Sequence, residues 1–179
     1  MFAVKEKTGE IVLRRHLDRE HRDRYEFTVE ARDHQPDQRT GTGIAQGSGT
    51  AQVRVDVTDV NDNAPYFVNA SRLYCFLRRS ARPGAEIARL VARDADRGPF
   101  GRITYQLHQA PVDLGLDLDE TSGLLYLGDS PKAADLLRNK REREFQVLIG
   151  AKDGGGLAAT SNLSIALQLV DDDEEVPRF

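Results

Sequence analysis

The chain has 179 residues, of which 39 % are hydrophobic and 30 % are charged, so it holds enough apolar material for a core and is not intrinsically disordered. Its 25 basic and 29 acidic residues leave a net charge of −4, which argues against broad nucleic-acid binding because no basic surplus neutralises phosphates. No apolar run is long enough to span a membrane, residues 1–18 lack the layout of a secretory signal, and the single cysteine, Cys75, excludes an intrachain disulfide and is expected to be a half-buried thiol.

Alternating apolar and polar residues predict half-buried β-strands along the whole chain. Near the N-terminus, strands are expected over 25–31 and 53–57, and the Gly, Ser, Thr and Gln-rich segment 34–50 between them is typical of a long flexible hairpin loop. Further strands are predicted near residues 73–77, 86–92, 102–107, 114–118, 124–128, 144–151 and 162–170. Short strands separated by turn-forming residues favour an antiparallel β-sandwich, and no helical period of comparable length occurs.

Two parts of the chain are similar to each other, which indicates an internal repeat of about 112 residues. The run YEFTVEARD, which ends at Asp33, aligns with FQVLIGAKD, which ends at Asp153, and DVNDNAPYF aligns with DDDEEVPRF. We therefore expect residues 1–63 to be the C-terminal half of one repeat and residues 64–179 to be a complete repeat. Because a half repeat has little core to offset chain entropy, residues 1–58 are expected to be loosely packed.

Carboxylates and amides gather at strand ends in four short motifs. These are LDRE from Leu17, DVNDN from Asp59, DAD from Asp94, and the single residue Asp153. Many carboxylates close together repel one another unless a divalent cation lies between them, and numerous hard oxygen donors suit Ca²⁺, whereas zinc favours His or Cys. A solvated acidic linker is the alternative for any one motif, but four motifs at repeat-related positions favour a calcium site.

The motifs LDRE, DVNDNAPYF and DAD followed by a glycine turn together resemble the linkers of the cadherin superfamily, in an atypical or protocadherin/Fat-like form. The resemblance implies an all-β fold, a seven-strand Greek-key, Ig-like cadherin sandwich, with no enzymatic activity. It also implies calcium-dependent cell–cell adhesion on the extracellular side of the plasma membrane. The partners would be other cadherin ectodomains, bound homophilically or heterophilically, and the chain would be a fragment of a single-pass membrane protein whose transmembrane segment lies outside it.

The resemblance also implies which residues bind calcium. Carried over by position, the ligands are Asp18, Glu20, Asp59, Val60, Asn61, Asp62, Asn63, Asp94, Asp96, Phe100 and Asp153. Phe100 replaces the family's usual Asn, a change that is tolerable because that position generally contributes a backbone carbonyl. A further glutamate ligand of the family, on the first strand of the preceding repeat, is absent here, so we expect one nearly complete calcium site and two partial ones.

The downstream linker departs from this pattern in its charges. Its residues are Arg79, where the family has a glutamate, Lys140 in the place of LDRE, and the acidic run that includes Asp171, Asp173 and Glu174. We expect this linker to bind fewer or no calcium ions, to be partly neutralised by Arg79 with Lys140 or Arg138, and to be more flexible than a metal-bound one. The rival interpretation is a register slip that lets Glu142 or Glu144 replace the missing glutamate.

Other functions remain as alternatives. The chain could be a non-adhesive spacer or a heterophilic receptor repeat of a long atypical cadherin, and it contains no tryptophan for the strand exchange of classical members. A metal-dependent hydrolase is disfavoured because no general base accompanies the acidic cluster. Two sequons, at Asn69 and Asn162, agree with glycosylation in an extracellular setting.

Overall fold

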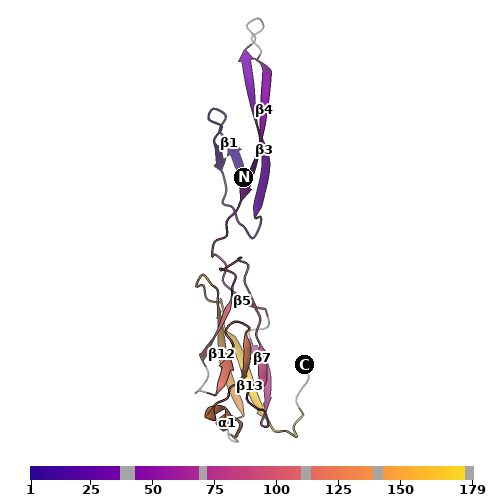
Figure 1. The fold of residues 1–179 in the computed structure, drawn as a ribbon, viewed down its shortest axis with the longest axis vertical. Helices are drawn as coiled ribbons and strands as arrows, with labels where there is room; N and C mark the ends of the chain where they lie inside the picture. The colour runs from indigo at the N-terminus through magenta and orange to yellow at the C-terminus, as the bar shows by residue number, and fades with distance from the viewer. Residues whose placement is uncertain (37–42, 69–71, 110–113, 139–142, 176–179) are drawn as a thin grey trace. The chain divides into compact units, whose positions relative to one another are not determined.

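The computed structural model describes residues 1–36, 43–68, 72–109, 114–138 and 143–175 (Figure 1). The chain divides into two compact units, which we call unit 1 (Met1–Asp59) and unit 2 (Val60–Phe179). Among the described residues, none of the helical segments has the length and apolar character needed to cross a membrane.

Unit 1 consists of two antiparallel strand pairs. β1 (Phe2–Val4) pairs with β2 (Ile11–Leu13), and β3 (Arg24–Pro36) pairs with β4 (Gly43–Asp56) in a long two-stranded ribbon (Figure 1). The ladder of this ribbon continues to the pair Pro36↔Gly43.

The predicted flexible loop over residues 34–50 is therefore wrong for most of its length, although residues 37–42 lie outside the described part. Ladder hydrogen bonds join backbone groups, so a segment with few apolar side chains can still extend a strand pair. The Gly, Ser, Thr and Gln-rich composition of the segment indicates that it lacks apolar alternation, which does not exclude strand pairing.

The core of unit 1 is small. Tyr25 is the one hydrophobic residue that is buried among the described residues of this unit. Phe2 packs edge-on against Tyr25, with ring centroids 5.5 Å apart, and stacks on Phe27 at 5.0 Å. Val4 and Leu13 stay 42 % and 51 % exposed, so little apolar surface supports this unit.

Unit 2 is a sandwich of two sheets, as predicted, but one of its strand pairs is parallel where an antiparallel sandwich was expected. One sheet has the order β6-β13-β12-β9, in which β6 and β13 are parallel and the other neighbours are antiparallel, and the second has the order β10-β11-β7. A short pair, β5 with β8, completes the unit. The bounds are β5 (Tyr66–Phe67), β6 (Arg72–Arg78), β7 (Glu86–Arg89), β8 (Ala92–Arg93), β9 (Thr104–Gln109), β10 (Leu116–Leu118), β11 (Leu124–Leu127), β12 (Glu144–Lys152) and β13 (Leu163–Val170).

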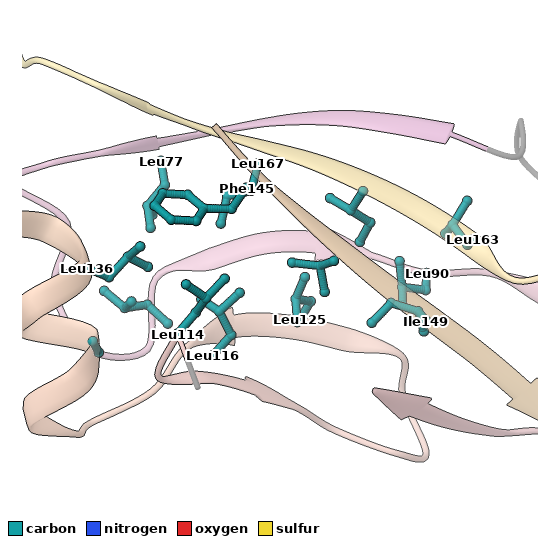
Figure 2. Packing of buried hydrophobic residues seen from close by; sticks show 14 of the residues in the cluster. Leu77, Leu90, Leu114, Leu116, Leu125, Leu136, Phe145, Ile149, Leu163 and Leu167 are labelled. Carbon is teal, nitrogen blue, oxygen red and sulfur yellow. The ribbon is translucent and has the colours of Figure 1, made fainter. Parts of the chain in front are cut away.

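The core of unit 2 lies between these sheets (Figure 2). Alternate residues of β12 and β13 point inward, so that Ile149 and Leu167 are fully buried, and Leu125 of β11 meets them from the second sheet. Each such side chain contributes about 1.5–3 kcal/mol of transfer free energy. Cys75 of β6 is half-buried against this core, as predicted, and burial raises the pKa of its thiol.

A short helix, α1 (Pro131–Arg138), closes one end of the core and was not predicted. Its N-cap is Ser130, whose Oγ accepts a hydrogen bond from the Ala133 N–H at 3.2 Å. Ser followed by Pro is a helix-start signal that the strand-like alternation of the neighbouring segments obscured. The helix buries Ala133 and Leu136, and Figure 2 shows Leu136 directed into the core.

Candidate metal centre

Three carboxylates come together where two loops of unit 2 meet. One loop follows β8 and carries Asp94 and Asp96, and the other follows β12 and begins with Asp153. Asp96 is only 6 % exposed and Asp153 only 4 %. Carboxylates are rarely this buried unless a partner compensates their lost hydration. A positive charge bound at this end of unit 2 would provide that compensation. We call Asn61, Asp94, Asp96 and Asp153 the acidic end of unit 2.

The backbone of its own loop fixes the side chain of Asp153. Its Oδ1 accepts hydrogen bonds from the N–H groups of Gly155 at 2.9 Å, Gly156, and Leu157 at 2.8 Å. Its Oδ2 is buried and has no hydrogen-bond partner among the described residues. One oxygen therefore orders the loop, and the other is available to a cation.

Asp94 and Asn61 show the same division of roles. Asp94 accepts the Asp96 N–H at 2.9 Å on Oδ1, whereas its Oδ2 is buried without a hydrogen-bond partner among the described residues. The Oδ1 of Asn61 is also buried without a hydrogen-bond partner among the described residues. A Cβ at Gly155 would collide with the Asn61 amide, so a larger residue at position 155 would have to displace that side chain.

Asp96 is held by Asn63 of the DVNDN motif. The Asn63 side-chain amide donates to Asp96 Oδ1 at 2.7 Å, and the Asn63 N–H donates to Asp96 Oδ2 at 3.3 Å. The same amide also donates to Asp62 Oδ1 at 2.9 Å. These hydrogen bonds fix the DVNDN motif against the DAD motif within unit 2.

The electrostatics of the acidic end favour a bound cation. Burial raises the pKa of Asp94, and the neighbouring carboxylates of Asp96 and Asp153 raise it further. A raised carboxyl pKa means that the negative charge is disfavoured where it stands. The unpartnered oxygens belong to carboxylates and an amide, which are hard donors that fit Ca²⁺ and not a thiophilic metal.

The predicted ligands of unit 1 lie around an arginine. Arg19 forms hydrogen bonds with Glu20 through one guanidinium nitrogen and with Asp59 through another. Asp18 instead accepts the His21 N–H at 3.1 Å, a bond that lowers the pKa of Asp18. The LDRE motif thus brings carboxylates together within this unit, and its own arginine neutralises two of them.

The remaining predicted residues are placed as follows. The carbonyl oxygen of Val60 accepts the Asp62 N–H at 3.0 Å, and Phe100 is half-buried in the turn after the DAD motif. Asn162 is exposed immediately before β13, whereas Asn69 lies outside the described residues, so glycosylation stays a prediction.

The predicted downstream linker carries arginine–carboxylate pairs in the structure. Arg79 pairs with Asp171 at 2.8 Å, while Asp173 is exposed and Lys140 lies outside the described residues. Sequence reasoning missed Arg143, which pairs with both Asp171 and Glu174. The signal available was its place directly before β12, next to the end of the antiparallel strand β13.

The rival register for the downstream linker would recruit Glu144. Its carboxylate lies 3.9 Å from the guanidinium of Arg72. Glu142, the other residue that this register would use, lies outside the described residues.

Comparisons with known proteins agree on one family. The family model described as the cadherin domain matches residues 1–58. Human protocadherin-23 is 34 % identical over 94 % of this chain, and cadherin-99C of Drosophila melanogaster is 32 % identical over 99 % of it. The chain spans only 4 % and 9 % of the lengths of these relatives.

Solved structures support the same assignment. A crystal structure of mouse cadherin-23 EC22-24 superposes with a TM-score of 0.76 at 25 % identity, covering 95 % of this chain and 49 % of that one. The chain belongs to the cadherin superfamily, whose extracellular repeats serve cell adhesion and are not enzymes.

Proposed function

We propose that this chain is a calcium-binding segment of a cadherin ectodomain that takes part in calcium-dependent cell–cell adhesion at the plasma membrane. The observation that carries the proposal is the set of buried oxygens on Asn61, Asp94 and Asp153 that have no hydrogen-bond partner within the described part of the chain. An unmet buried acceptor costs about 1–3 kcal/mol, and a divalent cation would offset that cost at several such atoms together.

The proposed ligands at the acidic end are the side chains of Asn61, Asp94, Asp96 and Asp153. The carbonyl oxygens of Asn63 and Phe100 and the assignments of Asp18, Glu20, Asp59, Val60 and Asp62 rest on the family resemblance and form part of the same proposal. Glu20 and Asp59 would act as ligands only once Arg19 has left their carboxylates. The proposed repeats are residues 1–63 and 64–179, and the resemblance further implies that calcium stiffens the connection between consecutive repeats. At about 1 mM calcium and a Kd of about 10⁻⁴ M, one ion stabilises the liganded state by about 1.4 kcal/mol.

Calorimetric titration of the full chain with CaCl₂ tests the proposal. We expect saturable binding with a Kd of about 10⁻⁴ to 10⁻³ M. Asp153→Asn removes one charge and keeps the side-chain shape, so it should weaken the tightest site at least about tenfold, the effect of 1.4 kcal/mol. The control is Asp135→Asn, which removes the same charge from the exposed face of α1 and should bind as wild type does. Absence of binding, or equal affinity in both variants, would contradict the proposal.

A non-adhesive spacer or heterophilic receptor repeat is the second candidate. It is favoured by the small share of each relative that the chain spans, because most repeats of so long an ectodomain lie far from its tip. Beads coated with the full chain would separate the two functions. Aggregation that requires calcium supports homophilic adhesion, whereas calcium binding without aggregation supports the spacer or a heterophilic partner.

A further inference from the structure

Basic and acidic residues meet at the end of unit 2 where β6 and β13 finish. The parallel register places Arg78 beside Val170, and the N–H of Arg79 donates to the Val170 carbonyl at 3.1 Å. The acidic run 171–175 follows directly. Arg143, the residue directly before β12, reaches the same place. We call Arg78, Arg79, Arg143, Asp171 and Glu174 the arginine end of unit 2.

The two carboxylates of this end are already bound by guanidinium groups. Asp171 receives Arg79 Nε on Oδ1 at 2.8 Å and Arg143 Nη2 on Oδ2 at 2.9 Å. Glu174 receives Arg143 Nη1 on Oε1 at 2.8 Å, and its Oε2 accepts the Asp171 N–H at 3.1 Å. One planar guanidinium, that of Arg143, therefore bridges two carboxylates in the manner that a divalent cation would.

Further hydrogen bonds attach the acidic run to the body of the unit. Arg78 donates to the Asp172 carbonyl at 2.8 Å, and the hydroxyl of Ser80 donates to Asp172 Oδ1 at 2.6 Å. Arg79 also donates through Nη1 to the Leu137 carbonyl at 2.8 Å, which is one of the last carbonyls of α1. A cation at a helix C-terminus interacts favourably with the helix dipole, so Arg79 joins the linker to the helix.

This donor set does not fit calcium. A Ca²⁺ ion needs six to eight oxygen ligands, and here three of the four carboxylate oxygens of Asp171 and Glu174 face guanidinium groups that would repel it. We propose that the arginine end of unit 2 is a metal-free linker, in which Arg79 and Arg143 replace a divalent cation on Asp171 and Glu174 and hold residues 171–175 in place without calcium. This inference is independent of the proposed function, because it uses no residue of the acidic end.

Two consequences distinguish an arginine clamp from a metal site. The order of residues 171–175 in an arginine clamp does not depend on calcium. It decreases as salt screens the exposed ion pairs. Both are measurable in the full chain by amide NMR, as the resonances and exchange rates of Asp171 and Glu174. We expect no saturable shift of these amides up to about 5 mM CaCl₂. Between about 0.05 M and about 0.5 M NaCl their exchange should accelerate.

Arg143→Gln removes the bridging charge at an exposed site and leaves the core intact. The exchange of the Asp171 amide, which donates to Glu174, should become about two- to fivefold faster. Arg143→Lys keeps the charge but cannot span two carboxylates, so its exchange rate should lie between wild type and Arg143→Gln. Arg89→Gln is the matched control, because it breaks an exposed pair with Glu86 elsewhere in the unit, and it should leave Asp171 unchanged.

Three results would overturn the inference. One is a calcium-saturable shift of the Asp171 or Glu174 amide in the wild-type chain. Another is unchanged exchange in Arg143→Gln. The third is an Asp171 amide in Arg143→Lys that exchanges as slowly as in wild type, because a positive charge would then suffice without bridging two carboxylates. Loss of calcium binding at the acidic end affects none of these readouts, so the two proposals fail separately.

Discussion

The two ends of unit 2 use the same acidic residue types in opposite electrostatic settings. At the acidic end, Asp94 and Asp153 each keep a buried oxygen without a hydrogen-bond partner among the described residues. At the arginine end, both oxygens of Asp171 face guanidinium groups. Carboxylates alone therefore do not predict a metal. The positive groups that fold back on them decide whether an ion is needed.

The largest effect in this comparison is expected from a substitution that forces the two loops of the acidic end apart. Gly154→Ala adds a Cβ that would collide with the carbonyl oxygen of Pro99, so the loops must separate. We expect a loss of about 1–3 kcal/mol in the free energy of unfolding, measured with urea, together with weaker calcium binding. Gly47→Ala is the control, because its Cβ meets nothing within 4 Å. Equal stability of the two variants would contradict the close approach of the loops.

A smaller effect is expected from calcium removal. Replacing about 1 mM calcium by chelator should cost about 1.4 kcal/mol per ion bound with a Kd of about 10⁻⁴ M, and should lower the Tm by about 3–6 °C. The loss of protection should be local, because the proposed ligands lie at the acidic end. Amide exchange should therefore accelerate near Asp94 and Asp153 but not at Asp171. Equal acceleration at both ends would erase the distinction between them.

The smallest effect is expected at the arginine end when the pH is lowered and Glu174 becomes protonated. The N–H of Asp171 and the guanidinium of Arg143, with Arg79 nearby, hold the pKa of Glu174 below its ordinary value of 4.5. Because the folded pKa is depressed, the contribution of this carboxylate to stability is fully present above pH 4.5 and is lost as the pH falls through the lowered value. NMR titration of the Glu174 carboxyl should give a midpoint below 4.5 that returns toward 4.5 in Arg143→Gln. A wild-type midpoint at or above 4.5 would refute the pairing.

The sequence predicted what depends on local patterns. The strands of unit 2 follow from alternation, since β12 and β13 bury every second residue from Phe145 and from Leu163, although Gly150, Ala166 and Val170 are buried as well. The DAD and DVNDN motifs identified the acidic end because metal sites need specific residue types at close spacing. The strands and the sandwich are confirmed, and the calcium ligands stay a proposal.

What the sequence did not predict depends on backbone pairing and on long-range side chains. The β3–β4 ribbon extends through a segment rich in Gly, Ser, Thr and Gln, whose sequence shows no apolar alternation that would have indicated a strand. The bridge from Arg143 to Asp171 and Glu174 joins positions about 30 residues apart through one long side chain, and only the fold brings them together. The helix α1 was missed although Ser130 and Pro131 marked its start.

The parallel pairing of β6 with β13 has a mechanical consequence. These are the first and last long strands of unit 2, and they run side by side through the register from Arg72↔Ser164 to Arg78↔Val170. Tension that pulls the N-terminal side of β6 away from the C-terminal side of β13 loads all of these pairs in shear at once, rather than peeling them apart one by one. The rate of forced unfolding is then set by the simultaneous rupture of the ladder.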